Sequence, residues 1–355
     1  MAHRTLVTSI GEITVDRRYY HCPQCGGATP WDQWAGLEGR MLTPAARRMV
    51  VLAGISWSFD KAQKRLWELC QLRLSDDTIE RVCQEEGIKV QQWTRESPAS
   101  GQAFVSAGGQ VEFSTDGLQI NTVDGWREMR VSVWSKREAC APCVPELWDQ
   151  RVLNEPTCRL AICAIAPCRR VGASWQRMNT RLGLGGTSLS ILADGAKWIW
   201  KEAGKRFSSR AQWCLDIYHG SQHIHQCAKA LWGEGAAAQR WADQRLRHVL
   251  RHNGPSLIAS LRAQQSQWPT EKQPALTRLV NYLEDNCDSM WYRDRLAAGL
   301  PIGSGLIEGA AKNVLGARLK INSARWRIRR AERIGALRCL DYSDLWETYW
   351  RSKAA

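Results

Sequence analysis

The chain has 355 residues, of which 44% are hydrophobic and 24% charged, a composition typical of a globular protein with two or three domains. Its formal net charge of +14 favours a polyanionic partner, and nucleic acid is the commonest one. No apolar run is long enough to span a membrane, and residues 1–10 lack the apolar core of a secretory signal. We therefore expect a cytoplasmic protein with no membrane partner, whose thirteen cysteines are mostly reduced.

The first segment, residues 1–40, combines strand-like alternation with a Cys-X-X-Cys pair. Residues 5–20 alternate between apolar and polar side chains and lead into Cys22 and Cys25. Two thiolates separated by two residues can share one Zn²⁺, but a structural site needs four ligands, and the other such pair, Cys140 and Cys143, is distant in sequence. Two interpretations therefore stay open: a structural zinc site, or a turn without metal.

The second segment, residues 41–95, predicts a helical domain. Helices are expected over residues 44–54, 59–72 and 76–86, with Ser75 as the cap of the third. Three short helices in this order fit a helix-turn-helix that binds DNA, and they also fit a plain helical bundle. Acidic residues at the start of the third helix are unfavourable for a helix that reads a DNA groove.

The third segment, residues 105–355, opens with strands. Residues 110–122 and 126–136 are rich in Val, Ile, Met and Trp, and the Asp124-Gly125 pair between them is a strong hairpin signal. A third strand is expected at 159–165. Two strand–helix units are predicted next: strand 188–193 with helix 196–207, and strand 213–217 with helix 220–231. A helical stretch at about 235–300 follows, interrupted near residues 253–255 and 268–269, and a last helix begins after Gly305. This order predicts an α/β, ribonuclease H-like mixed sheet with a helical insertion.

Three acids are placed where cleavage of a phosphodiester would need them. Two Mg²⁺ or Mn²⁺ ions about 4 Å apart can activate the nucleophile and stabilise the charge on the phosphate, and such ions prefer carboxylate ligands. Asp116 lies within a strand, Asp194 ends a later strand, and Glu308 lies in the first turn of the last helix. Each acid alone is ordinary, but their order along the chain predicts a metal centre.

Several segments carry a resemblance to a known family. The most specific is Ile-Gly-Ser-Gly-Leu-Ile-Glu at 302–308; the others are 123–128, 196–200, 215–219, 317–320 and 324–326. On these residues the chain resembles the ISKra-type insertion-sequence transposases, relatives of the Mutator-like DDE group, from Arg4 to Trp350. Members of the family usually carry further residues ahead of the segment at Arg4, and no family motif is recognised in the cysteine-rich stretch 137–180.

The resemblance implies a bacterial, nucleoid-associated transposase with a ribonuclease H-like catalytic domain. It implies that Asp116, Asp194 and Glu308 are the metal ligands. Asp216 competes with Asp194, because it also ends a predicted strand. In the Mutator-like group an Asp or Cys separated by two residues from a His follows the second aspartate, and Asp216 with His219 matches this motif. We therefore expect Asp194 to be the ligand and His219 to contact the scissile phosphate or orient a ligand.

The stretch after Glu308 is strongly basic. Between residues 309 and 338 nine Lys or Arg residues face one acid, Glu332, whereas a solvated helix face usually mixes both signs. We expect a track for the phosphates of double-stranded DNA, comprising Lys312, Arg318, Lys320, Arg325, Arg327, Arg329 and Arg330. Trp326 in the same stretch is expected to pack in the core.

The sequence therefore predicts a transposase that acts on terminal repeats and target DNA as a homodimer or larger assembly. Two alternatives stay open. One is a catalytically silent DNA-binding protein derived from a transposase, and the other is a ribonuclease H-like nuclease without strand transfer. The presence of all three acids argues against the first, and the predicted helix-turn-helix and helical insertion argue against the second.

Overall fold

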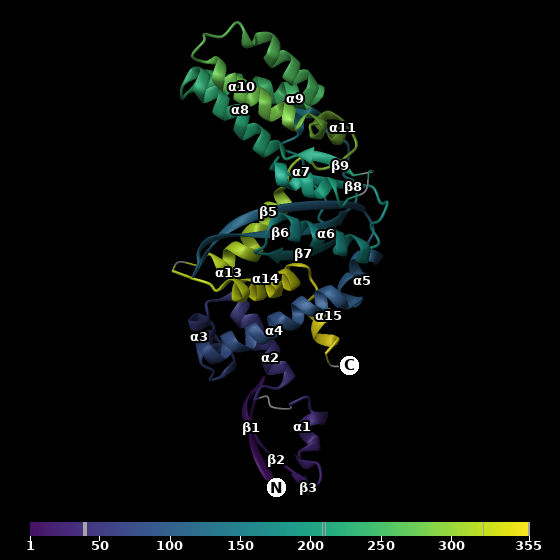
Figure 1. The fold of residues 1–355 in the computed structure, drawn as a ribbon, viewed down its shortest axis with the longest axis vertical. Helices are drawn as coiled ribbons and strands as arrows, with labels where there is room; N and C mark the ends of the chain where they lie inside the picture. The colour runs from purple at the N-terminus through teal and green to yellow at the C-terminus, as the bar shows by residue number, and fades with distance from the viewer. Residues whose placement is uncertain (38–40, 208, 210, 322, 354–355) are drawn as a thin grey trace.

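The computed structural model describes residues 1–37, 41–207, 209, 211–321 and 323–353. It is a mixed α/β protein that runs from small N-terminal hairpins through a helical region and a five-stranded sheet to many further helices (Figure 1). The N-terminal hairpins lie at one end of an elongated molecule (Figure 1). None of the helices in the described ranges is long and apolar enough to cross a membrane.

Two small antiparallel hairpins form the N-terminal end. The strand pairs are β1 (Ala2–Thr8) with β2 (Gly11–Arg17), and β3 (Tyr20–Cys22) with β4 (Gly26–Ala28). The short helix α1 (Pro30–Trp34) follows, and the carboxylate of its buried Asp32 binds the guanidinium groups of Arg4 and Arg17. The strands expected from the alternation in this segment are confirmed.

The helical region is built on side-chain caps and one buried ion pair. Thr43, Ser58 and Ser75 each accept a hydrogen bond from the backbone at the start of a helix. The capped helices are α2 (Pro44–Ser56), α3 (Phe59–Cys70) and α4 (Asp76–Glu96), and α5 (Ala99–Ser106) follows. Arg47 of α2 donates to the fully buried carboxylate of Glu86 on α4 at 2.6 Å. The third helix is ten residues longer than predicted because its second half packs against the C-terminal helices.

The sheet contains an antiparallel meander and two strands parallel to its first member. The strands are β5 (Gln110–Thr122), β6 (Gly125–Arg137), β7 (Cys158–Ala164), β8 (Leu189–Ala193) and β9 (Gln212–Leu215). Their order across the sheet is β7-β6-β5-β8-β9, in which β6 is antiparallel to β5 and β7, and β8 is parallel to β5 and β9. The predicted hairpin is confirmed, and Gly125 at its turn has a φ of 89°, which favours glycine.

Helices cover both faces of this sheet (Figure 1). On one face α6 (Cys168–Arg181) and α7 (Lys197–Gly204) pack against the sheet through aromatic rings. The ring centroid of Phe113 on β5 lies 5.1 Å from that of Trp175 on α6. On the other face α14 (Ile328–Tyr342) crosses β7, with Gly335 so close to Cys163 that a Cβ at this glycine would lie 2.5 Å from the sulfur. The core therefore holds the sheet between two helical layers.

The chain leaves the sheet after β9 and returns to it after a helical excursion. Four helices build a second hydrophobic core: α8 (Ile217–Trp232), α9 (Ala236–Gln265), α10 (Gln273–Asp285) and α11 (Tyr292–Ala297). The predicted interruption near Pro255 is a kink in α9, where Asn253 has a φ of 64°. The returning elements are α12 (Gly305–Ala310), the π-helix η3 (Ala311–Gly316), α13 (Ala317–Leu319), α14 and α15 (Trp346–Arg351).

Candidate active site

Three aspartates lie in one row across neighbouring strands. The last residues that β5 and β8 pair in parallel are Ser114 and Leu192. Two residues after each of them come Asp116 and Asp194, so this register places the two aspartates side by side. The last pair of β8 and β9 is Ala193 with Leu215, so Asp216 takes the next position beside Asp194. The ends of parallel strands meet at one sheet edge, which is where open α/β sheets bind their ligands. Tertiary structure thus brings together acids that are up to 100 residues apart (216 − 116).

Asp116 and Asp194 form a half-buried pair of like charges. Burial raises the pKa of Asp116, the adjacent charge of Asp194 raises it further, and a hydrogen bond from the Gly117 amide at 2.6 Å opposes both effects. The carboxylate of Asp194 accepts a hydrogen bond from the Ala196 amide at 2.9 Å. Two partly desolvated carboxylates at one edge repel each other until a cation lies between them. Their chemistry fits a Mg²⁺ or Mn²⁺ ion, which prefers carboxylate oxygens.

Asp216 is buried, and its carboxylate is already used in hydrogen bonds. It accepts from the Tyr218 amide at 2.8 Å, from Nδ1 of His219 at 3.2 Å and from the hydroxyl of Ser304. Burial alone would raise the pKa of Asp216, but the three hydrogen bonds outweigh burial and lower it. Asp216 is therefore an ionised anchor for His219 and Ser304, whereas Asp194 keeps more of its oxygen surface for a ligand.

His219 lies between Asp216 and the carboxylate pair. The hydrogen bond with Asp216 raises the pKa of His219, burial opposes this effect, and the charges of Asp194 and Asp116 add to it. His223, one turn further along α8, stacks on Tyr282 with ring centroids 3.7 Å apart, and burial lowers its pKa. Among the described residues no group of three or more His, Cys, Asp or Glu side chains could hold a metal ion.

A pH titration tests the role of Asp216. We expect the NMR midpoint of His219, measured in EDTA, to lie above that of His223, and Asp216→Asn to lower the midpoint of His219 while leaving that of His223 in place. Because the pKa of His219 is raised on folding, its contribution to stability is present below the unfolded pKa and disappears as the pH rises through the folded value. Equal midpoints for the two histidines would contradict the assigned hydrogen bond.

Glu308 lies near the row but points to another partner. Its helix, α12, packs against β5 and β6, and the amide of Ile217 donates to the carbonyl of Ile302 just before that helix. The Glu308 side chain is 64% exposed, and its carboxylate binds the Lys312 ammonium at 2.6 Å. Asp116, Asp194 and Glu308 therefore do not form a closed three-carboxylate centre among the described residues. A π-helix, a feature often found at functional sites, follows directly after α12.

Ser304 is a site residue that the sequence did not indicate. It occupies the N-cap position of α12, where a serine usually accepts a hydrogen bond from its own helix, but its side chain makes no cap bond. The hydroxyl donates instead to Asp216, 88 residues earlier in the chain. In sequence Ser304 looks like an ordinary helix cap, so only the folded chain identifies this contact.

The predicted basic track divides into surface residues and one core residue. Arg318 is a correction: it is 2% exposed, its Nε donates to the Gly54 carbonyl at 2.8 Å, and burial lowers its pKa to about 10. Its guanidinium stacks on Phe59 and Trp326, and Trp326 is buried as predicted. Arg318 therefore holds the helices together and cannot bind DNA. The exposed members of the track are Lys312, Lys320, Arg325, Arg327, Arg329 and Arg330, of which Arg330 also binds Glu80.

This division leads to opposite outcomes for two arginine variants. Arg318→Ala should lower the free energy of unfolding by about 2 kcal/mol, because it removes a charged hydrogen bond and two cation–π contacts. Arg327→Ala should leave stability unchanged and reduce the slope of log affinity for duplex DNA against log salt by about 1. Urea unfolding and binding at several salt concentrations measure both quantities. A stable Arg318→Ala protein with weakened DNA binding would contradict the assignment.

The cysteine pair at the N-terminal end does not complete a zinc site. Cys22 ends β3 and Cys25 precedes β4, and a hydrogen bond with Cys25 lowers the pKa of Cys22. The described residues supply two thiols here, without a third metal donor in the group, whereas structural zinc needs four ligands. Cys140 and Cys143 lie elsewhere, where their amides donate to the carbonyls of Gly299 and Leu296.

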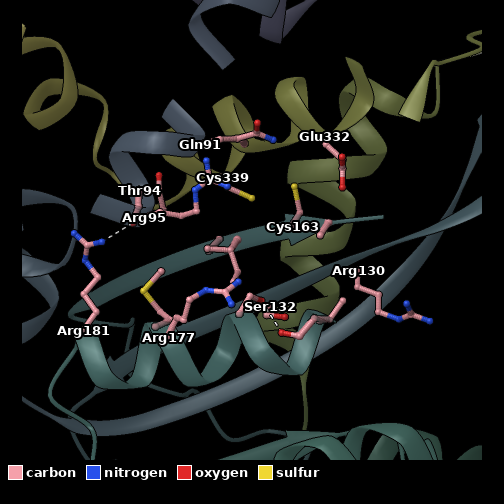
Figure 2. A pocket seen from close by; sticks show the side chains of 17 residues that line it. Gln91, Thr94, Arg95, Arg130, Ser132, Cys163, Arg177, Arg181, Glu332 and Cys339 are labelled. Atoms are coloured by element: carbon pink, nitrogen blue, oxygen red, sulfur yellow. Dashed lines mark hydrogen bonds between the residues drawn. The ribbon is translucent and has the colours of Figure 1, made fainter. Parts of the chain in front are cut away.

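A cavity of about 380 Å³ lies beside the edge strand β7, away from the aspartate row. Figure 2 shows Arg177 and Arg181 of α6 on one side, and Cys163 and Cys339 on the other. A hydrogen bond with Cys339, together with burial, raises the pKa of the Cys163 thiol well above its usual value. Because the thiolate is the reactive form, Cys163 is not a nucleophile at neutral pH. The Cys163 thiol therefore gives this cavity no reactive nucleophile.

Comparisons with known proteins add no family assignment. No protein-family model matches the chain, and a search of curated proteins found no similar sequence.

Proposed function

We propose that the chain is a DDE-class DNA transposase that cuts DNA at the ends of an insertion sequence and joins the freed 3′ ends to target DNA. The observation that carries the proposal is the row of aspartates at one sheet edge, with Glu308 on a helix that packs against β5. The strand order supports it, because an antiparallel meander followed by two parallel strands is what a ribonuclease H-like core requires. The helices between β9 and α12 correspond to the expected insertion.

In the proposed mechanism each acid has a distinct task. When bound, two Mg²⁺ or Mn²⁺ ions would supply an activated nucleophile and neutralise charge on the scissile phosphate. Asp116 and Asp194 would hold the cations, since they are the adjacent, half-buried pair. Asp216 orients His219, whose imidazole, in its protonated form, would donate a hydrogen bond to a phosphate oxygen beside the pair.

Glu308 joins the site when DNA arrives. In the free protein Lys312 neutralises this carboxylate, one helical turn away. A DNA phosphate competes for the Lys312 ammonium, because charge-assisted hydrogen bonds to phosphate are strong. Release of Lys312 would leave Glu308 free to turn toward Asp116 and to serve as the third ligand. When Lys312 exchanges Glu308 for a phosphate, its ammonium group becomes one of the basic-track contacts to the DNA backbone.

The partners follow from the charge and the reaction. The exposed Lys and Arg residues after Glu308 bind the phosphates of terminal repeats and target duplex. A homodimer or larger assembly holds both ends of the element for concerted joining. The protein works in the bacterial cytoplasm, associated with the nucleoid.

A catalytically silent DNA-binding protein is the second candidate, and one observation favours it. The Glu308–Lys312 ion pair keeps the third carboxylate away from the aspartate row. In a silent protein this pair would persist on DNA, and Glu308 would serve only to stabilise its helix.

Strand transfer in vitro tests the proposal. The substrate is a DNA duplex carrying the sequences that flank the gene, together with a supercoiled target plasmid, incubated with the full chain in Mg²⁺ or in EDTA. The expected result is cleavage at the ends and covalent joining to the plasmid in Mg²⁺ alone. DNA binding without cleavage would support the silent protein, and cleavage without joining would support a ribonuclease H-like nuclease.

A further inference from the structure

The β5–β6 hairpin extends well beyond the rest of the sheet. Its two strands pair along their whole length, from Gln110 with Arg137 to Thr122 with Gly125. By contrast, β8 pairs only with residues 111–114, and β7 only with residues 130–136. The outer half of the hairpin is therefore a two-stranded ribbon that reaches toward α13 (Figure 1).

The tip of this ribbon is fixed to the segment that precedes α14. The Val123 amide donates to the Trp326 carbonyl at 2.9 Å, and the Trp326 amide donates to the Asn121 carbonyl at 3.0 Å. The guanidinium of Arg325 donates to the Val123 carbonyl at 3.2 Å. Because Trp326 is itself buried, these bonds anchor the tip to the core and present its side chains in a defined arrangement.

We name the exposed residues of this region the tip cluster: Val123, Trp126, Arg127, Arg325 and Arg327. Trp126 is 62% exposed, whereas Trp134 on the same strand is fully buried. Within the described parts of the chain no other ring or cation stacks on the indole of Trp126. Arg325 and Arg327 lie in the segment that is hydrogen-bonded to the tip, and Arg127 follows Trp126 along β6. Asp124 is an exposed acid in the turn of the tip. The cluster thus offers a bare aromatic face within a positive surface.

We propose that the tip cluster binds unpaired nucleotides of DNA, with Trp126 stacked on a base and the arginines on the flanking phosphates. This inference rests on the proposed function and adds a second element to its DNA-binding surface. Phosphates of a duplex require only cations, whereas an indole face finds a matching aromatic face where a base has left the stack. A second copy of the cluster is a poor partner, since its arginines would meet like charges.

The spacing along β5 relates this contact to the aspartate row. Asn121, which pairs with Trp126, lies five residues beyond Asp116 (121 − 116). At about 3.3 Å per residue of strand, the separation is about 17 Å. A DNA strand covers this distance in about five nucleotides at 3.4 Å each. The stacked base would therefore lie about five nucleotides from the phosphate that faces the aspartate row.

Fluorescence anisotropy with a labelled single-stranded 12-mer, and with the matching duplex, tests the proposal. The full chain is used in EDTA, so that the result does not depend on catalysis. Trp126→Ala should weaken single-strand binding by about five- to 150-fold, the effect of losing one base–aromatic stack, and should weaken duplex binding less. Trp126→Phe should keep most of the affinity. The control Trp34→Ala removes another exposed indole, 84% exposed on α1, and should change neither affinity.

An abasic 12-mer completes the experiment, because it retains the phosphates but has no bases. Wild type and Trp126→Ala should bind it equally. An equal loss on abasic and normal strands would overturn base stacking, as would unchanged binding by Trp126→Ala. A changed oligomeric state of Trp126→Ala in light scattering would overturn it in favour of self-association. If the protein shows no strand transfer but its single-strand binding depends on Trp126 as described, the tip proposal stands while the transposase proposal fails. The two proposals can therefore fail separately.

Discussion

Asp116→Asn should reduce the rate of strand transfer in Mg²⁺ by about 1,000-fold. Loss of a metal ligand removes several kcal/mol of transition-state stabilisation, and each 1.4 kcal/mol corresponds to about tenfold in rate. Asparagine has the same shape and still accepts the hydrogen bond from the Gly117 amide, so the local structure should be preserved. The charge is lost, and with it the half-buried pair that attracts the cation. Quantified joining products in a time course measure the effect.

The control is Asp149→Asn, which neutralises an exposed aspartate without a hydrogen bond or ion pair among the described residues. Its activity should stay within about twofold of wild type, as expected for a surface change. Equal activity of wild type and Asp116→Asn would remove the basis for the proposed mechanism.

The same assay separates the two candidates for the second ligand. Asp194→Asn should be as severe as Asp116→Asn, because Asp194 has the more accessible carboxylate. Asp216→Asn should cost less, about tenfold to 100-fold, since it acts through the orientation of His219. The reverse order of severity would transfer the metal-ligand role to Asp216.

Arg47→Met should lower the free energy of unfolding by about 3 kcal/mol, the cost of removing one partner of a buried ion pair. Arg47 joins α2 to α4 through Glu86, which is 0% exposed and also binds Tyr349 and Lys353 from the C-terminal end of the chain. The pair thus ties the helical region to the last helix. In urea the midpoint should fall by about 1 M for a slope of about 3 kcal/mol per M.

The neighbouring Arg48 provides the control for this prediction. Arg48 binds Glu347 on the surface, where both side chains are exposed, so Arg48→Met should change stability by about 1 kcal/mol or less. Similar losses for the two variants would show that burial of Glu86 does not determine the effect.

Local signals in the sequence identified most of the elements. Caps such as Ser75, the Asp124-Gly125 turn and apolar periodicity depend on residues a few positions apart, and they predicted the helices of the second segment, the β5–β6 hairpin and the kink near Pro255. The end of α4 was less accurate, because helix length there depends on packing against α14, far along the chain.

The aspartate row illustrates the division most clearly. The sequence by itself determined that Asp116 lies within a strand segment and that Asp194 and Asp216 lie at the ends of two later ones, because strand periodicity and strand ends are local properties. Only the tertiary structure decided that these strands are neighbours in register, that Asp216 is held by Ser304, and that Arg318 lies in the core. Such contacts join residues up to 264 positions apart, and their partners are chosen by packing and desolvation, which no local pattern of residue types encodes.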